Sequence, residues 1–230
     1  MAKVPEQIVP GVYRVDAVGL PYGVSVLLIR DSDGWALVDT GRNSLRIQQA
    51  LAALGAGPSD LKRIYLTHHH SEHAGGLSDL LWWAPHAELW TSRHEARIIS
   101  GRSRPDWLSN PLFRPFAAQG LPTVPIGRIQ TVVEGKRFAG FRVIATPGHT
   151  YGHTSLLSEQ HRLLFAADAL GGLLEIRAGV IKGICANPMN AKRSAEKLLK
   201  EEFDAVVFSH GKPLREDAKQ RLREALAADV

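Results

Sequence analysis

Histidines gather in one short segment, and their spacing suits the binding of a metal ion. Four of the ten histidines fall within residues 68–73, which read His-His-His-Ser-Glu-His. The segment follows an apolar stretch at 64–66 that predicts a buried strand, which argues against the plainer alternative of a histidine-rich surface loop. Because alternate residues at a strand end face the same way, His68 and His70 can point at one position while His69 points away. Imidazole and carboxylate donors suit Zn, Fe or Mn.

The composition limits the other kinds of chemistry. A length of 230 residues, with 44% hydrophobic and 22% charged residues, predicts one globular domain over residues 1–230. Cys185 is the single cysteine, which excludes an internal disulfide and a cysteine-rich zinc site. A net charge of +5 favours anionic partners, but the basic residues alternate with acids and no nucleic-acid motif occurs, so nucleic-acid binding is not expected.

The same data give expectations about location and assembly. No apolar run approaches the ~20 residues of a membrane span, and the first residues have no signal-peptide core. We therefore expect a cytoplasmic protein that acts on a small molecule and has no membrane partner. The sequence leaves the oligomeric state open, a homo-oligomer included.

The hydrophobic pattern predicts two groups of strands, each followed by helices, which favours two sheets packed together with helices outside. Strands are expected at residues 9–15, 24–29, 35–38, 64–66, 88–90, 129–133, 141–144, 154–157, 163–165 and 205–208. Helices are expected at residues 45–54, 75–83, 92–100, 191–200 and 216–227. The segment 101–127 contains five prolines and is expected to be an irregular loop of functional importance.

Five short motifs, in chain order, resemble those of the metallo-β-lactamase superfamily. They are Leu-Val-Asp-Thr-Gly at 37–41, the histidine segment at 68–73, Thr-Pro-Gly-His-Thr at 146–150 with Gly152 and His153, Phe-Ala-Ala-Asp at 165–168, and Ser-His-Gly at 209–211. The resemblance implies an α/β (α+β) fold, the four-layer αββα sandwich of two mixed β-sheets flanked by helices. The glyoxalase II and lactonase-like branch is the most similar. Only 20 residues follow His210, so no counterpart of the C-terminal helical domain of glyoxalase II is expected.

The resemblance also implies a centre of one or two divalent metal ions, with Zn first and Fe or Mn as alternatives. The implied ligands are His68, His70 and His149 for one ion, Glu72, His73 and His210 for a second, and Asp168 as a bridge between them. Two ions about 3.5–4 Å apart can share a water and lower its pKa enough to form hydroxide at neutral pH. Asp39 is expected to hold the ligands in position rather than to bind metal.

Glu72 departs from the superfamily pattern, which usually has Asp at this position. Glutamate is one methylene longer, so its carboxylate reaches ~1.5 Å further if the backbone is unchanged. Three interpretations stay open: Glu72 bends and binds the second ion, it swings away and leaves that site weak or empty, or it accepts a proton beside a single ion.

These features together favour a metal-dependent hydrolase, with Asp168 and Glu72 as catalytic residues, that uses metal-activated hydroxide on an ester, thioester or lactone. A mononuclear iron persulfide dioxygenase of the same fold is one alternative, and a catalytically silent binding module is another. A true β-lactamase of this fold would usually lack the bridging carboxylate. The aromatic residues expected to line the substrate pocket are Tyr22, Trp107, Phe113 and Phe116.

Overall fold

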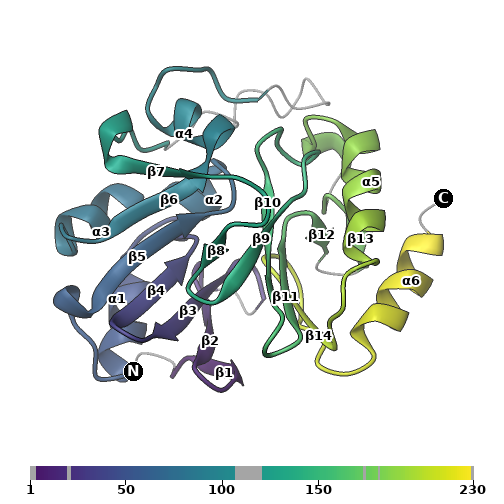
Figure 1. Ribbon diagram of the computed structural model, residues 1–230, viewed down its shortest axis with the longest axis horizontal. Helices are drawn as coiled ribbons and strands as arrows, with labels where there is room; N and C mark the ends of the chain where they lie inside the picture. The colour runs from purple at the N-terminus through teal and green to yellow at the C-terminus, as the bar shows by residue number, and fades with distance from the viewer. Residues whose placement is uncertain (1–3, 20–21, 107–120, 173–174, 181, 229–230) are drawn as a thin grey trace. The chain divides into compact units, whose positions relative to one another are not determined.

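The computed structural model describes residues 4–19, 22–106, 121–172, 175–180 and 182–228. Trp107, Phe113 and Phe116 lie outside the described residues, and the prediction that they line a pocket stays a prediction. The chain divides into two compact units, residues 1–104 with 118–132 and residues 105–117 with 133–230. Figure 1 traces the chain by colour from the N-terminus in purple to the C-terminus in yellow.

The first unit is built on a seven-stranded mixed sheet whose strand order follows the sequence, from β1 to β7. Its strands are β1 (Glu6–Val9), β2 (Val12–Asp16), β3 (Ser25–Asp31), β4 (Gly34–Val38), β5 (Leu61–Leu66), β6 (Glu88–Ser92) and β7 (Ile129–Val132). Its helices are α1 (Leu45–Ala53), α2 (Ser71–Ala74), α3 (Leu77–Trp83) and α4 (Arg93–Ile99), with 3₁₀ turns at Pro58–Asp60 and Ile126–Arg128. Neighbouring strands are antiparallel from β1 to β4 and parallel from β4 to β7.

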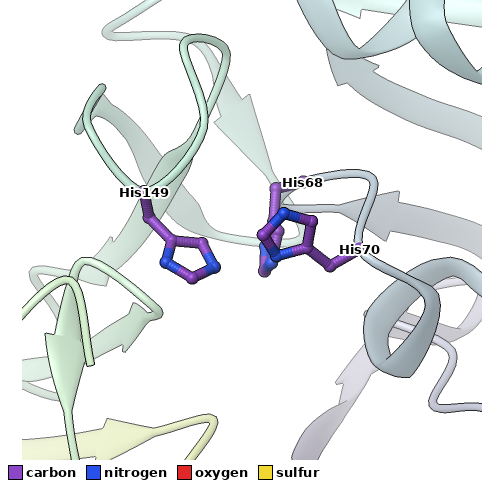
Figure 2. Close-up of side chains that lie close together, drawn as sticks. All are labelled: His68, His70 and His149. Atoms are coloured by element: carbon purple, nitrogen blue, oxygen red, sulfur yellow. The ribbon is translucent and has the colours of Figure 1, made fainter. Parts of the chain in front are cut away.

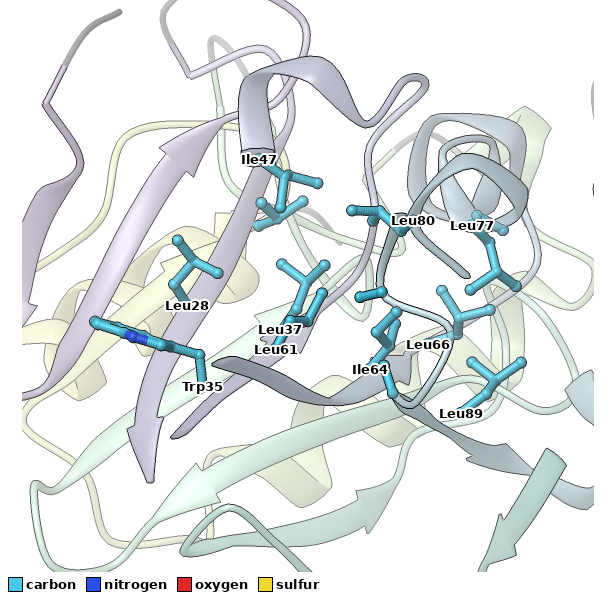
Figure 3. Packing of buried hydrophobic residues seen from close by; sticks show 14 of the residues in the cluster. Leu28, Trp35, Leu37, Ile47, Leu61, Ile64, Leu66, Leu77, Leu80 and Leu89 are labelled. Atoms are coloured by element: carbon cyan, nitrogen blue, oxygen red, sulfur yellow. The ribbon is translucent and has the colours of Figure 1, made fainter. Parts of the chain in front are cut away.

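One face of this sheet carries a continuous apolar core under helices α1, α3 and α4. Ile47 of α1 and Leu80 of α3 point toward Leu37 and Ile64 of the sheet, as Figure 3 shows. All four side chains are fully buried, and each contributes about 1.5–3 kcal/mol relative to an exposed position. Strands β4 and β5, which contribute Leu37 and Ile64 to this core, are therefore held firmly at the ends that precede Asp39 and His68.

Two elements of this unit differ from the sequence prediction. The strand expected at 9–15 is two strands, because Gly11 adopts a left-handed φ of 77° and turns the chain between β1 and β2. The helix expected at 75–83 is preceded by the separate short helix α2, and α3 begins only at Leu77. Gly76 lies between the two helices, and a Cβ there would lie 2.7 Å from the carbonyl oxygen of Thr40, so a larger residue would displace its neighbours.

The second unit is built on a five-stranded mixed sheet in the order β14-β11-β10-β9-β8, with a separate two-stranded β12-β13 ribbon. Its strands are β8 (Arg137–Phe138), β9 (Phe141–Ala145), β10 (Thr154–Ser158), β11 (Leu163–Ala167), β12 (Leu170–Gly171), β13 (Arg177–Ala178) and β14 (Ala205–Phe208). Its helices are α5 (Pro188–Leu198) and α6 (Ala218–Ala228), with a 3₁₀ turn at Lys182–Ile184. Strands β11 and β14 are parallel, and the other pairs are antiparallel.

Helices α5 and α6 bury Ala195, Leu198 and Leu222 against Leu164 and Val206 of this sheet. Helix α5 begins three residues earlier than expected, because the Asn187 side chain caps it and proline takes the first position. In the described part of the chain, no helix is both long and apolar enough to cross a membrane. The expected fold class is confirmed, since two mixed sheets with helices make up the molecule.

Candidate functional site

In the first unit, the candidate residues follow the carboxyl ends of two adjacent parallel strands. Strand β4 ends just before Asp39, and β5 ends just before Thr67 and His68. The N–H of Asp39 donates to the carbonyl of Tyr65 (2.8 Å), which carries the β4–β5 pairing one residue beyond the strand. Asp39 itself has a left-handed φ of 63°, which aspartate tolerates better than most residues. The sheet thus places one carboxylate beside the start of the histidine segment.

The Asp39 carboxylate organises two histidines at once. It accepts hydrogen bonds from the Thr67 N–H (2.8 Å), from Thr67 Oγ1 (2.8 Å) and from Nδ1 of His73 (2.9 Å). Because the Thr67 hydroxyl spends its proton on Asp39, its oxygen is the acceptor in the 3.0 Å contact with Nδ1 of His68. Both imidazoles therefore donate from Nδ1, and a neutral ring in this orientation keeps its lone pair on Nε2. All four residues are fully buried.

His70 and Glu72 lie where this loop becomes helix α2. The carbonyl of His70 accepts a hydrogen bond from the N–H of His73 (2.9 Å), which closes the loop into the helix. A donor atom of His68 lies within 4.8 Å of one on His70 and of one on His73, and a Glu72 carboxylate oxygen is equally near His73. The rings of His68 and His70 meet edge to face at a centroid distance of 4.8 Å (Figure 2). Glu72 is partly exposed, unlike the histidines.

His69 is engaged elsewhere, on Glu95 of helix α4. Its Nδ1 lies 2.7 Å from Oε2 of Glu95, and both side chains are fully buried. The Nδ1 side of His69 therefore faces Glu95, as alternation along the strand end predicts, while its ring still meets that of His70 edge to face at a centroid distance of 5.1 Å.

In the second unit, Asp168 and His210 again follow adjacent parallel strands, β11 and β14. His149 lies on the loop between β9 and β10, where Figure 2 also draws it. The Nε2 atoms of His149 and His210 lie 3.2 Å and 3.4 Å from the same oxygen, Oδ2 of Asp168. Two imidazoles and one carboxylate therefore converge on a single point, and His149 and Asp168 are almost completely buried.

The backbone of Gly179 fixes the orientation of His149. Nδ1 of His149 lies 3.2 Å from the Gly179 carbonyl, which can only accept, so a neutral ring keeps its lone pair on Nε2 toward Asp168. The same carbonyl accepts the S–H of Cys185 (3.3 Å). Gly179 has a left-handed φ of 69°, and a Cβ there would lie 2.3 Å from the Cys185 sulfur. Only glycine brings this carbonyl to the ring without displacing its neighbours.

These donor sets fit a divalent transition metal. They contain imidazole nitrogens and carboxylate oxygens, as zinc, iron and manganese sites do. Nδ1 of His68, His73 and His149 is bound to an oxygen acceptor in each case, which is how proteins usually orient metal-binding imidazoles. The lone pair on Nε2 of His149 and the nearby oxygen of Asp168 repel each other, and a cation bound by both would offset that repulsion.

Tyr22 lies in a different place from these donors. Its ring stacks on the guanidinium of Arg14 at 4.7 Å, and both line a pocket of about 290 Å³ together with Asp16 and Arg46. None of the candidate metal ligands lies among the described residues that line this pocket. The prediction that Tyr22 contacts the substrate stays a prediction.

Several residues that orient the histidines could not be identified from the sequence. Thr67 belongs to the histidine motif, but its relay between Asp39 and His68 depends on the register of two strands. Glu95 looks in the sequence like an ordinary acidic residue near the start of a helix, and only the fold brings its carboxylate to Nδ1 of His69. Gly179 contacts His149 through its backbone carbonyl, and the identity of a residue does not predict a backbone contact of this kind.

Within each unit, the residues of the sequence motifs therefore lie close together. Comparison with known proteins shows which family these motifs belong to. The model of the metallo-β-lactamase superfamily matches residues 19–210. This chain belongs to the metallo-β-lactamase superfamily.

Three similar proteins illustrate the breadth of the superfamily. A hydroxyacylglutathione hydrolase of Aeromonas hydrophila is 29% identical over 80% of this chain and 59% of its own length. An atrochrysone carboxyl ACP thioesterase of Aspergillus fumigatus is 30% identical over 59% of this chain and 27% of its own length. The crystal structure of a metallo-β-lactamase family protein from Thermus thermophilus superposes with a TM-score of 0.70 at 24% identity, covering 97% of this chain and 80% of the other. That likeness shows a shared fold. The chain spans less than two thirds of the length of the curated relatives that it matches.

Proposed function

We propose that this member of the metallo-β-lactamase superfamily is a metal-dependent hydrolase that cleaves a thioester bond in a small molecule. The observation that carries the proposal is the arrangement around Asp39, which holds Nδ1 of His73 directly and Nδ1 of His68 through Thr67. Burying the Asp39 carboxylate is unfavourable for packing and stability. Its presence is explained if it serves to orient the Nε2 atoms of two imidazoles toward a ligand.

The proposed centre contains one or two divalent ions. The proposed ligands are His68, His70 and His149 for the first ion, Glu72, His73 and His210 for the second, and Asp168 for both. Support comes from the grouping of donors within each unit and from the convergence of His149 and His210 on Asp168. When bound, such ions lower the pKa of water and polarise a carbonyl group.

The residues of the chain supply position and proton transfer. Asp39 orients the imidazole of His73 directly and that of His68 through Thr67, and the Gly179 carbonyl orients that of His149. Glu72 is the one partly exposed carboxylate of the group, so it can exchange a proton with solvent as well as bind a cation. The proposed role of Asp168 is to hold a negative charge at the point where two imidazoles meet.

The preference for a thioester over an oxoester or lactone is supported by the relatives. Hydroxyacylglutathione hydrolases and an acyl-carrier-protein thioesterase are among the similar proteins. A thiolate is a better leaving group than an alkoxide, so a thioester also makes the smallest demand on a leaving-group acid.

The proposal is tested with one protein preparation loaded separately with Zn, Mn and Fe, and with a chelator-treated control. Each form is assayed against a glutathione thioester, the matched oxoester, an acyl lactone and an activated phosphodiester. We expect metal-dependent release of thiol to be the fastest reaction. Equal turnover by the chelator-treated protein would refute the metal mechanism. Oxygen consumption with a persulfide would favour the dioxygenase, and metal binding without any turnover would favour a silent binding module.

A further inference from the structure

His153 lies in a buried chain of hydrogen bonds that runs from Asp168, just after strand β11, back to Ala166 within that strand. The backbone N–H of Asp168 donates to Nε2 of His153 (3.1 Å). Nδ1 of His153 contacts Oγ1 of Thr146 (2.8 Å), which contacts Oγ of Ser155 (3.0 Å). Ser155 donates to the carbonyl of Ala166 (2.9 Å). The three side chains between the two ends are buried, with at most 1% exposure.

Every bond in this chain has one possible direction. A backbone N–H can only donate, so Nε2 of His153 accepts from Asp168 and the ring proton is on Nδ1. Nδ1–H therefore donates to Thr146, whose hydroxyl donates to Ser155, whose hydroxyl donates to the Ala166 carbonyl. A carbonyl can only accept, so the far end agrees with the near end. Both ring nitrogens of His153 are used within the chain, which leaves neither as a metal donor.

The two ends of the chain enclose an irregularity in the backbone. The pairing of β11 with β14 skips Ala166, which makes it a bulge, and Ala167 has a left-handed φ of 48°. Bulges beside functional sites change the direction of a side chain, and a non-glycine residue with positive φ needs support from its surroundings. The carbonyl before Ala167 and the N–H after it are the two groups that the chain holds. Asp168 takes its direction from this turn.

We propose that His153, through Thr146 and Ser155, is a positioning residue that sets the direction of the Asp168 carboxylate toward the metal ions. The proposal rests on the proposed metal centre, in which Asp168 is a ligand. A bulge that contains a residue with positive φ can adopt other backbone conformations. The hydrogen bonds that run from the Asp168 N–H to the Ala166 carbonyl stabilise one of them. Second-layer groups of this kind change metal affinity by about 10–100-fold when they are removed.

Substitutions at His153 and Thr146 separate positioning from packing. His153→Leu keeps the volume and removes both nitrogens, whereas His153→Gln restores an acceptor for Asp168 and a donor for Thr146. Thr146→Val removes the relay hydroxyl at constant shape, and Thr146→Ser keeps it. His161→Leu, in the turn between β10 and β11, is the matched control at the other end of the same hairpin.

The measurements are Co²⁺ affinity of the full chain after chelator treatment, the visible spectrum of the Co²⁺ form, and the melting temperature without metal. We expect His153→Leu and Thr146→Val to weaken Co²⁺ binding by about 10–100-fold and to change the spectrum. His153→Gln and Thr146→Ser should recover most of the affinity, and His161→Leu should match the wild type.

Unchanged affinity and spectrum in Thr146→Val, whatever its melting temperature, would overturn the proposal. So would a His153→Gln variant that binds Co²⁺ no better than His153→Leu. If His153→Leu does not fold, the Thr146 pair still decides the matter. These readouts need no turnover, so a wild type that binds Co²⁺ but hydrolyses no thioester would refute the proposed function and leave the positioning role standing.

Discussion

Replacing Asp39 with Asn tests whether this carboxylate fixes the imidazole tautomers. The two side chains have nearly the same shape, but the amide offers one acceptor oxygen where the carboxylate offers two. If the oxygen faces Thr67, the amide N–H₂ meets the Nδ1–H of His73, where the wild type has a 2.9 Å hydrogen bond. The clash is relieved when the His73 proton moves to Nε2, which removes the lone pair from the proposed donor atom. The opposite orientation leaves the Thr67 N–H facing the amide N–H₂.

The magnitude follows from the number of buried groups affected. Either orientation leaves about one buried donor without an acceptor, which costs about 1–3 kcal/mol in the free energy of unfolding. We expect metal affinity to fall by about 10–100-fold, because an outer partner of a metal-binding imidazole is lost. Of the two sites, the second should lose more, since His73 contacts Asp39 directly and His68 only through Thr67.

The assay is competition for Zn²⁺ against a chromophoric chelator, with urea unfolding of the metal-free protein measured in parallel. Asp33→Asn is the matched control, because Asp33 is half exposed and pairs with Arg63 on the same unit. We expect the control to keep wild-type affinity. An Asp39→Asn variant with wild-type affinity at both sites would refute the reasoning, even if its stability were reduced.

Three further predictions concern single residues. His70→Ala should lose first-site metal and reduce kcat by several orders of magnitude. His86→Ala, at an exposed turn, should leave both metal content and kcat unchanged. Metal analysis and steady-state kinetics of both variants measure these effects. If Glu72 binds the second ion, Glu72→Gln should lower stoichiometry toward one and Glu72→Asp should raise it toward two; if it acts as a base, Glu72→Gln should keep the metal and lose about 10²–10⁴-fold in kcat. Glu72→Gln with full metal and full activity would remove the residue from the site. Burial, and to a smaller extent the Asp168 carboxylate, raises the pKa of the Cys185 thiol to about 12, so about one thiol in 10⁴ is ionised at pH 8. The native protein should resist a thiol reagent at pH 8 that reacts at once after unfolding, and rapid labelling of the native chain would contradict the burial argument.

The fold could be predicted from the sequence wherever hydrophobic pattern and strand length agree. Strands β3 and β4 have apolar centres and were expected within two residues of their observed bounds, whereas β5 was expected only at 64–66 because Lys62 and Arg63 interrupt its apolar pattern. The two-residue strands β8, β12 and β13 were not expected, since two residues carry no periodicity. Helix boundaries shifted where a cap decided them, as at Asn187.

The histidine cluster at 68–73 could be recognised from spacing alone, whereas the remaining candidate ligands were named through the resemblance of five motifs to the metallo-β-lactamase superfamily. The hydroxyl groups that orient them could not be identified from the sequence. Thr67, Thr146 and Ser155 are hydroxyl residues of a common type, and each acts only because the fold places its oxygen 2.8–3.0 Å from a particular ring or hydroxyl.

The two units solve the same physical problem by different means. An imidazole that binds a metal ion through Nε2 needs an acceptor that holds its proton on Nδ1. In the first unit the holder is a charged side chain, Asp39, at the end of β4. In the second it is a neutral backbone carbonyl, that of Gly179, beyond β13. A carboxylate raises the basicity of the imidazole more than a carbonyl does, so His73 should be the stronger donor and His149 the weaker. That difference would compensate for Glu72 in place of the usual aspartate: the ion with the less regular carboxylate ligand is the one that His73 would bind.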